Sequence, residues 1–364
     1  MHFGRKQGLL FLILFLGTVT LTFAEIPDPV VEYLFNENGV LVFSTGSEKI
    51  PLEFKDEGGL SDLHSQGGLG VSGSLGDRAF DNTSSSGVAE MAAAERLNPA
   101  LSAFTSSTWQ GWFKFSKEPA NSSRIFDKYG NNYQVYYAVG GSLLLNIMNN
   151  SVRSEKEYKK LNEWVFFAVT YDYTLNENNV SFYVGTKTEP VSLVSTHTLN
   201  VAMQNNSMNL KIGGWNMQTA RFTGLLDNIR LFGSKSDSTG VLSLEQLEAI
   251  RIGDTLLIPD QSKCVIRANR TTATASLDEN IEVTVKVVDA FETNLEGIVV
   301  SLENLTGEIV HDNLTATTDV NGIATFILNS LQPGKLNLEA KIFPGFGFTP
   351  ITLFNDRIQI EFVL

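Results

Sequence analysis

Disulfide bonds and clustered metal ligands are missing from this sequence. Its 364 residues include a single cysteine, Cys264, and four histidines, none with a second His or Cys at metal-ligand spacing. An intramolecular disulfide is therefore excluded, and so are the common zinc motifs. The folded chain must be held by burial of apolar side chains, and we expect Cys264 to be a small buried hydrophobe near a domain junction.

Basic residues are scarce relative to acidic ones. The chain carries 27 lysines and arginines against 40 aspartates and glutamates, which gives a formal net charge of −13 at pH 7. A nucleic acid is bound through clustered positive charge, which this composition does not supply. The sequence therefore excludes a general nucleic-acid binder.

Long hydrophobic runs are confined to the start of the chain. Arg5 and Lys6 form a basic beginning, Leu9 to Leu16 is apolar, and residues 22–24 read as a small-x-small cleavage site. This pattern predicts a signal peptide over residues 1–24, and no later stretch approaches the length of a transmembrane segment. We therefore expect a secreted protein, in the extracellular space or the cell envelope.

What the sequence does contain is a series of short aromatic and β-branched runs. They are Val30 to Phe35, Ser107 to Ser116, Tyr133 to Met148, Glu163 to Asp172 and Val180 to Thr186. Turns rich in Asn, Gly, Ser and Pro separate them, and helical periodicity is almost absent. This pattern is typical of an all-β sandwich.

Two segments depart from the β pattern. Ala89 to Leu97 has a composition that favours a short helix, with an irregular strand as the open alternative. Ser243 to Gln246 is a capping box, which predicts a helix over Leu244 to Arg251 that closes the first domain.

The run Leu225 to Phe232 contains an internal conflict. It alternates as a strand does, and strict alternation places Asp227 on the same face as Ile229 and Leu231. A carboxylate on an apolar face needs a cation or several hydrogen-bond donors. Asp227 is therefore the first candidate for a functional residue.

The order of the motifs in the first two thirds of the chain resembles a known family. From Asp28 to Arg251 they are VVEYLFNENG, GDRAFDN, STWQGWFKF, NEWVFFAVTYD, VSFYVG, LKIGG, FTGLLDNIRLF and LSLEQLEAI. Together they resemble the laminin G-like, concanavalin A-like lectin/glucanase jelly roll of secreted bacterial proteins. The resemblance implies two antiparallel sheets packed face to face. It also implies a core that includes Trp112, Trp164, Phe182 and Ile229.

The same resemblance implies a structural calcium site where the first and last strands meet. Calcium takes oxygen ligands from carboxylates, Asn side chains and backbone carbonyls. Asp227 is the expected principal ligand, and the others are Asp81, Asn82 and Asn36. This chain has Asn36 where the family often has Asp, which lowers the ligand charge. The alternative is that Asp227 accepts hydrogen bonds from backbone amides and that Asp81 caps the turn after it.

Two clusters have the composition of a glycan-binding surface. Sugars are bound by aromatic faces and by Asn, Asp and Gln side chains, usually in loops on a rigid sandwich. One cluster is Tyr129, Asn131, Asn132 and Tyr133, and the other is Trp215, Asn216 and Gln218. For both clusters, half-buried packing beside a strand is the alternative.

The catalytic motifs of glucanases with this fold are missing. Retaining enzymes need two carboxylates about 5 to 5.5 Å apart, supplied by a Glu-x-Asp-x-x-Glu-like run that this sequence lacks. A G-x-S-x-G nucleophile elbow is missing as well. We therefore expect that the protein is not an enzyme.

The rest of the chain resembles the bacterial immunoglobulin-like domains of invasin-type surface proteins. The motifs VVDAFETNLEGIVVSLEN and TTDVNGIATF carry the likeness. The resemblance implies a second β-sandwich that serves as a spacer or adhesive unit. Within it, Asp319 to Gly322 is expected to be a turn and not a metal site.

These observations predict four segments and one leading function. The segments are a signal peptide (1–24), a jelly roll (25–251), a linker (252–262) and an immunoglobulin-like domain (263–364). We expect a secreted, non-catalytic protein of the adhesion type that binds a carbohydrate or another cell-surface component through the jelly roll. The first alternative is a structural or protein-docking module of the cell envelope. The second is a glycoside hydrolase that acts on a polysaccharide.

Overall fold

The described chain folds almost entirely into β-strands. The computed structural model describes residues 25–84, 87–91, 99–119, 121–128, 132–155, 158, 160–215, 220–307, 314–344, 349–353 and 357–364. Within these ranges there are one α-helix, α1 (Leu244–Thr255), and one short 3₁₀ helix (Pro99–Leu101). The predicted all-β class is confirmed. No helix in the same ranges is both long and apolar enough to cross a membrane.

The first sandwich is built on a seven-stranded antiparallel sheet, sheet A. Its strands are β1 (Val31–Tyr33), β5 (Phe80–Asp81), β7 (Ser106–Lys114), β12 (Val165–Asp172), β13 (Val180–Thr186), β14 (Ser192–His197) and β16 (Leu225–Ser234). They are ordered β1-β16-β7-β12-β13-β14 among the described residues, with β5 also paired to β16. The first and last strands of the jelly roll therefore lie side by side.

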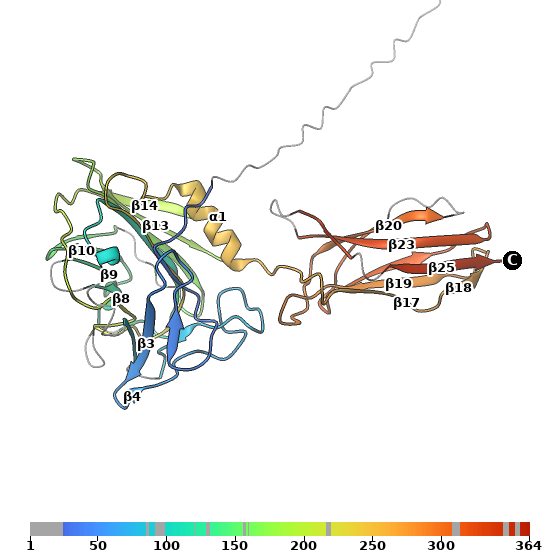
Figure 1. Ribbon diagram of the computed structural model, residues 1–364, viewed down its shortest axis with the longest axis horizontal. Coiled ribbons are helices and arrows are strands. Elements are labelled where there is room, and N and C mark those ends of the chain that lie inside the picture. The colour runs from blue at the N-terminus through green and yellow to red at the C-terminus, as the bar shows by residue number, and fades with distance from the viewer. Residues whose placement is uncertain are drawn as a thin grey trace, which may run out of the picture.

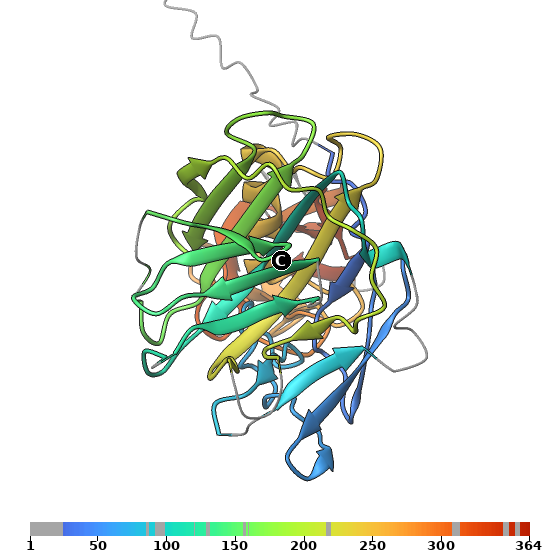
Figure 2. The ribbon, with the colours of Figure 1, turned by 90° about the vertical axis from the view of Figure 1, so that its left-hand side faces the viewer.

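The opposing sheet, sheet B, collects strands that are far apart in the sequence. Its strands are β2 (Leu41–Phe43), β3 (Pro51–Asp56), β4 (Gly59–Leu60), β6 (Val88–Met91), β8 (Ser123–Asp127), β9 (Tyr133–Tyr137), β10 (Leu143–Ile147), β11 (Asn150–Arg153) and β15 (Lys211–Ile212). Their order in the described chain is β11-β10-β9-β8-β15-β6-β3-β2, with β4 paired to β3. Figure 2 shows the strands of sheet B in front of those of sheet A.

Two of the predicted β segments differ in detail from the structure. Tyr133 to Met148 is a hairpin of β9 and β10, because Gly140 and Gly141 take positive φ angles of 92° and 93° and turn the chain. Ala89 to Met91 belongs to β6, which pairs with β3 and β15, so a helix is wrong for these residues. Sheet pairing overrides their helical composition, and residues 92–97 lie outside the described ranges.

The main core fills the space between the two sheets. It is dominated by aromatic side chains, including Tyr33, Phe54, Phe113, Phe126 and Tyr171. Trp112, Trp164, Phe182 and Ile229 are all buried, as the sequence predicted. Trp112 and Trp164 belong to a second, smaller cluster on the other face of sheet A, where α1 covers it.

Strand β16 contains a β-bulge that changes which face its side chains occupy. The register with β7 shifts between Asp227 and Arg230, and Asn228 has a positive φ of 47°. Ile229 consequently packs in the main core, whereas Leu225, before the bulge, packs in the smaller cluster under α1. The prediction that Asp227 shares a face with Ile229 is therefore wrong, because strict alternation does not hold across the bulge.

Helix α1 begins as the sequence predicted and ends one turn later. Ser243 accepts a hydrogen bond from the backbone amide of Gln246, and the Gln246 side chain accepts one from the Ser243 amide. Near the end of the helix, Asp254 accepts two hydrogen bonds from Arg230 and one from the indole of Trp112. These contacts fasten the end of the helix to sheet A.

The second sandwich pairs a three-stranded with a six-stranded sheet. The first is β17 (Val265–Ala268), β19 (Ile281–Lys286) and β22 (Ile323–Leu328). The second is β18 (Thr272–Thr274), β20 (Val299–Gly307), β21 (Leu314–Thr317), β23 (Gly334–Phe343), β24 (Ile351–Thr352) and β25 (Ile358–Val363). Asp319 caps the predicted turn by accepting hydrogen bonds from the amides of Asn321 and Ile323. Cys264 is buried in this core, as expected.

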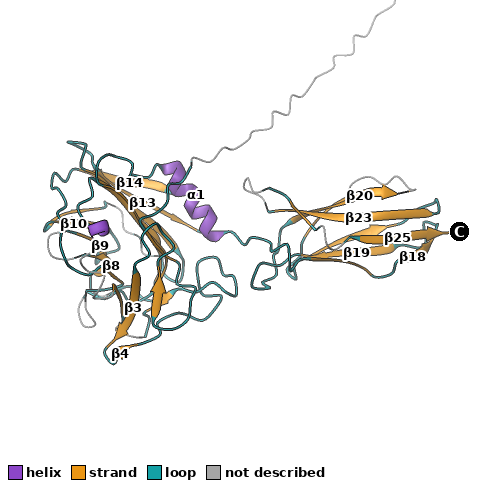
Figure 3. Ribbon diagram, viewed as in Figure 1, coloured by secondary structure: helices purple, strands orange, loops and turns teal. Residues whose placement is uncertain are grey.

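The two sandwiches have separate hydrophobic cores and are joined in the chain directly after α1 (Figure 1). Figure 3 shows α1 on the side of the first sandwich that faces the second. The described cores share no residue. Each sandwich can therefore unfold as its own cooperative unit.

Replacing Phe113 by Ala is expected to destabilise the first sandwich alone. Phe113 is 1% exposed, and its ring packs against Phe115 and Tyr137. Removing a buried phenyl ring costs about 3–5 kcal/mol. Urea unfolding followed by tryptophan fluorescence and by circular dichroism will show one shifted transition. Leu193→Ala, at a half-exposed position of edge strand β14, is the control. An equal shift of both transitions would show that the two cores are coupled.

Candidate functional site

The outer face of sheet B carries a polar and aromatic surface. Along β9 the side chains alternate, so Tyr133 and Val135 enter the core while Gln134 and Tyr136 lie on the opposite face. The neighbouring strands place Arg124 and Asp127 (β8), Lys211 (β15) and Glu90 (β6) beside them. Charged and aromatic groups from four strands therefore meet on one face.

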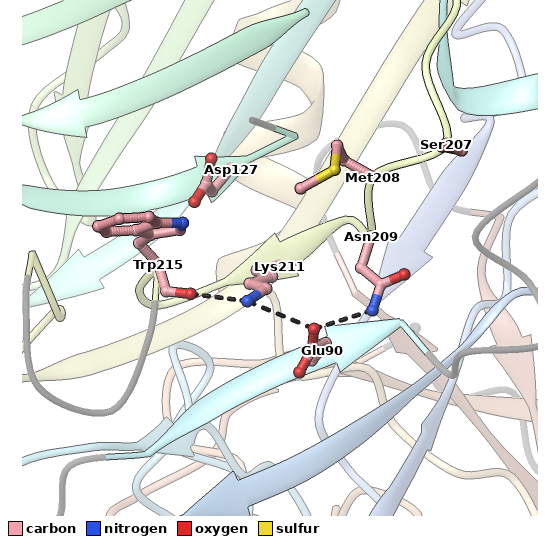
Figure 4. Close-up of a pocket in the computed structure, with 7 residues that line it drawn as sticks. All are labelled: Glu90, Asp127, Ser207, Met208, Asn209, Lys211 and Trp215. Atoms are coloured by element: carbon pink, nitrogen blue, oxygen red, sulfur yellow. Dashed lines mark hydrogen bonds and ion pairs between the residues drawn. The ribbon is translucent and has the colours of Figure 1, made fainter. Parts of the chain in front are cut away.

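A small pocket of about 140 Å³ opens on this face (Figure 4). It is lined by Glu90, Asp127, Ser207, Met208, Asn209, Lys211 and Trp215. The strands supply Glu90, Asp127 and Lys211, and the segments on either side of β15 supply the remaining four. A volume of this size is suited to one small polar group or to part of a single sugar ring.

Trp215 forms an aromatic wall of the pocket and is held in place by two neighbours. Trp215 is 37% exposed. The Lys211 ammonium donates a hydrogen bond to the Trp215 carbonyl at 2.7 Å. The guanidinium of Arg124 lies 5.0 Å from the centre of the indole ring and 5.3 Å from that of Tyr136. The indole is therefore positioned before any ligand arrives.

Glu90 is the acidic wall of the pocket, and its neighbours keep it ionised. The Asn209 amide donates to Glu90 at 2.8 Å, and the Lys211 and Lys55 ammonium groups lie 3.3 and 3.6 Å from its carboxylate. Burial alone would raise the pKa of Glu90, but the Asn209 hydrogen bond and the two positive charges outweigh it, so the pKa is lowered. Glu90 therefore acts as a hydrogen-bond acceptor at neutral pH.

Asp127 is a second hydrogen-bond acceptor of the pocket, and its partners hold its carboxylate in place. It is 1% exposed, and it accepts hydrogen bonds from Arg124 at 2.6 Å and from the Gln134 amide at 2.9 Å. Tyr136 in turn donates to Gln134 at 2.8 Å. This chain of hydrogen bonds links the pocket to the half-buried Tyr136 of β9.

Lys128 supports the pocket wall from behind. Its ammonium donates to the Met208 carbonyl at 2.7 Å, and the residue is completely buried. Burial lowers the pKa of Lys128 to about 8. Its hydrogen bond fixes the segment that carries Ser207 and Asn209 into the pocket.

The structure brings only part of the predicted glycan surface to a common site. Trp215, from the second predicted cluster, lines the pocket. Tyr133 is fully buried and its ring packs 5.1 Å from that of Trp109, so its prediction as a ligand platform is corrected. Asn132 is also buried, at 3% exposure. The other four residues of the two clusters, Tyr129, Asn131, Asn216 and Gln218, lie outside the described residues.

Sequence reasoning missed the charged half of the site. Glu90, Asp127 and Lys211 are adjacent only because β15 pairs with both β6 and β8, at long sequence separation. The alternation of β9 was a usable signal, because the polar Gln134 shows that Tyr133 faces the other way. No comparable local pattern marks Glu90.

The four predicted calcium ligands each make hydrogen bonds to partners of their own. Asn36 accepts a hydrogen bond from the Arg78 amide, and Asp81 accepts two from Thr83. Asn82 bonds across its own turn to Gly87. In the described chain, no three or more His, Cys, Asp or Glu side chains form a group that could hold a metal ion.

Asp227 occupies a different environment from the other predicted ligands. It is fully buried and accepts hydrogen bonds from the amides of Val71 and Asn228, both at 2.7 Å. Burial raises its pKa well above the ordinary value, and the negative charges of Asp77 and Asp254 raise it further. Burial also raises the pKa of Asp77. Two buried acids thus lie on the face of sheet A that α1 covers.

Residues 85–239 match the family model of the concanavalin A-like lectin/glucanases superfamily. This match lies within the first sandwich and covers less than half of the chain. It supports the predicted jelly roll, and it does not extend to the second sandwich. No curated protein matches the chain significantly.

Several solved structures are similar to this chain at low identity. Domain 4 of the extracellular arabinanase AbnA from Geobacillus stearothermophilus, in complex with arabinotriose, is 14% identical with a TM-score of 0.43, and the match covers 62% of this chain and 100% of that one. A pentraxin from Limulus polyphemus is 16% identical with a TM-score of 0.31, covering 42% and 71%. The binding domain of botulinum neurotoxin serotype D is 12% identical with a TM-score of 0.43, covering 92% of each. At these scores, none of the three supports an argument about ligand or mechanism.

Asp227→Asn is expected to flatten the pH dependence of stability when calcium is removed by a chelator. A carboxyl whose pKa is raised by folding stabilises the native state below the ordinary pKa, and this contribution is lost as pH rises through the folded-state pKa. The difference in unfolding free energy between variant and wild type should therefore grow in favour of the variant as the pH rises above about 4. Asp81→Asn, at the cap of an exposed bend, should show no such trend. A constant difference would mean that Asp227 is charged throughout this range.

Proposed function

We propose that the first sandwich binds a neutral carbohydrate in the pocket beside Trp215, and that it does so without catalysis. The observation that carries this proposal is the partly exposed indole of Trp215, fixed beside ordered hydrogen-bonding side chains. The C–H face of a sugar stacks on an aromatic ring, while its hydroxyl groups both donate and accept hydrogen bonds. The pocket offers both kinds of partner.

The match to the lectin/glucanase superfamily supports a carbohydrate as the ligand class. A fold of this kind also serves other functions, so the site itself has to agree with the ligand. Here Glu90 and Asp127 accept hydrogen bonds, and the amide of Asn209 and the ammonium of Lys211 donate them. This is the mixture of groups that a polyhydroxyl ligand requires.

The charges around the pocket favour a neutral sugar over an acidic one. Glu90 is paired with Lys211 and Lys55, and Asp127 is paired with Arg124. The positive charges are thus already neutralised by the protein's own carboxylates. A uronic or sialic acid would have to compete with these carboxylates for the same cations.

The state of Glu90 supports a binding site over a hydrolytic one. A general acid in glycoside hydrolysis needs a raised pKa so that it keeps a proton near neutral pH. The pKa of Glu90 is lowered, because Asn209, Lys211 and Lys55 favour the ionised form against the effect of burial. Glu90 is therefore poorly suited to protonate a leaving group.

The remaining parts of the chain fit an exported adhesion protein. The first 24 residues have the pattern of a signal peptide, and the second sandwich has the motifs of a bacterial immunoglobulin-like spacer. In this proposal the second sandwich carries the sugar-binding domain at the outside of the cell or in its envelope.

Calcium is proposed as a structural ion of the first sandwich, held by Asp227 and Asp77. Both are buried carboxylates, which fits the oxygen ligands that calcium requires. Asp227 and Asp77 accept hydrogen bonds from the neighbouring amides of Val71 and Ser72, which brings the two carboxylates to the same loop. Asn36, Asp81 and Asn82 make their hydrogen bonds to other partners and are left out of this set. A bound cation would offset the repulsion between the two acids.

Trp215→Ala is expected to weaken sugar binding by at least about tenfold, which is 1.4 kcal/mol. The wild-type ligand is first found on an array of neutral and acidic glycans, and its affinity is then measured by calorimetry. Tyr173→Ala is the matched control, because Tyr173 is a similarly exposed aromatic residue elsewhere in the first sandwich. Preferred binding of acidic glycans would contradict the neutral ligand.

Two other outcomes would replace the proposal. If the wild-type protein binds no glycan and self-associates, the first sandwich is a structural or docking module. If the purified protein releases sugar from a polysaccharide and Glu90→Gln abolishes the release, the protein is a hydrolase.

Excess calcium is expected to raise the thermal midpoint of the first sandwich relative to a chelator. A ligand that binds only the native state adds about 2.7 kcal/mol at one hundred times its dissociation constant. Asp227→Asn should lose this response, and Asp81→Asn should keep it. If the Asp227→Asn variant responds as fully as the wild type, calcium binds elsewhere.

A further inference from the structure

The two sandwiches touch through a pair of loops that the sugar site does not use. One is Gly70–Asp77 in the first sandwich, and the other is Asp289–Thr293 in the second. The contacts between them join residues more than 200 positions apart in the chain. They are separate from the covalent connection that follows α1.

The first loop is braced on the jelly roll before it meets its partner. The Val71 amide donates to Asp227, while the amide and the hydroxyl of Ser72 donate to Asp77. A side chain at Gly70 would collide with the Asp77 carboxylate, since its Cβ would lie 2.3 Å from that group. These contacts hold the loop in one conformation on the first sandwich.

The second loop is organised in the same way by one carboxylate. Asp289 is 5% exposed, and one of its oxygen atoms accepts hydrogen bonds from the amides of Phe291 and Thr293, each at 2.8 Å. Its other oxygen is left to face the first sandwich. Phe291, at the tip of the loop, remains 53% exposed.

The two braced loops fit together through polar and steric contacts. The Ser74 hydroxyl donates to the free oxygen of Asp289 at 2.5 Å, and both residues are buried. The Leu75 amide donates to the Thr293 hydroxyl at 2.9 Å. The ring of Phe291 covers Gly76 so closely that a Cβ there would lie 2.1 Å from it. Only glycine at position 76 permits this approach.

The covalent connection is short and anchored at both ends. Asp254 is bonded to Arg230 and Trp112 of the first sandwich. Asp260 donates its amide to Val288 and accepts from Cys264 in the second sandwich. Five residues separate these anchors. Val288, which Asp260 contacts, directly precedes Asp289, so the connection reaches the second sandwich beside the second loop.

We propose that loops Gly70–Asp77 and Asp289–Thr293 form a clasp that fixes the orientation of the two sandwiches. A short connection alone would leave rotation about its bonds free, whereas a second, buried contact removes that freedom. The second sandwich then acts as a rigid stalk that holds the first at a set angle. This inference does not depend on the identity of the ligand.

The clasp is tested by distance measurement in the full mature chain. Spin labels are attached at Ser238→Cys and Leu331→Cys, two exposed positions in different sandwiches, and the distance distribution is measured by pulsed electron paramagnetic resonance. Cys264 is buried, so a sample without the added cysteines checks that it takes no label. A narrow distribution is expected for this protein.

Gly76→Val should broaden the distribution, because the new side chain displaces Phe291. Gly253→Val is the matched control, since a Cβ at Gly253, in the last turn of α1, meets no atom within 4 Å. Both variants must keep two cooperative unfolding transitions, and Ser74→Ala provides a milder change that leaves the loop backbone intact. A broad distribution in the starting protein, or a narrow one in Gly76→Val, overturns the proposal.

Discussion

The bulge in β16 determines which side chains of this strand enter the main core and which face helix α1. β16 lies between β1 and β7 in sheet A, and its left-handed residue, Asn228, shifts the alternation so that Asp227 and Ile229 fall on opposite faces. Ile229, after the bulge, packs between the sheets, whereas Asp227, before it, faces the cover formed by α1 and the Gly70–Asp77 loop. A regular strand would have to bury that carboxylate among aromatic rings.

The sequence alone predicted most of the secondary-structure elements. It predicted neither the surroundings of Asp227 nor the sugar pocket in full. Val180 to Thr186 alternates cleanly and corresponds to β13, and the capping box marks the start of α1. Asp227 was identified as unusual, but its surroundings were not, because one residue in a left-handed conformation reverses the pattern after it. Asn tolerates that conformation, and Asn228 was therefore the one local sign of the bulge.

The sugar pocket shows a second limit of local reasoning. Its acceptors and donors come from strands that become neighbours only in the folded sheet, with β15 inserted between β6 and β8. Periodicity can state which face of a strand Gln134 occupies, but not which distant strand lies next to it. Trp215 could be found from its residue type, whereas Glu90 required the register of the sheet.

The placement of β25 has a mechanical consequence for the second sandwich. β25 pairs in parallel with β18 and antiparallel with β23, and in Figure 1 it runs toward the end of the molecule opposite the connection to the first sandwich. Tension applied between that connection and Val363 would act along the strand axis. The hydrogen bonds on both sides of β25 would then be loaded in shear, all at once, and could not open one after another as in a zipper. A module built in this way resists pulling.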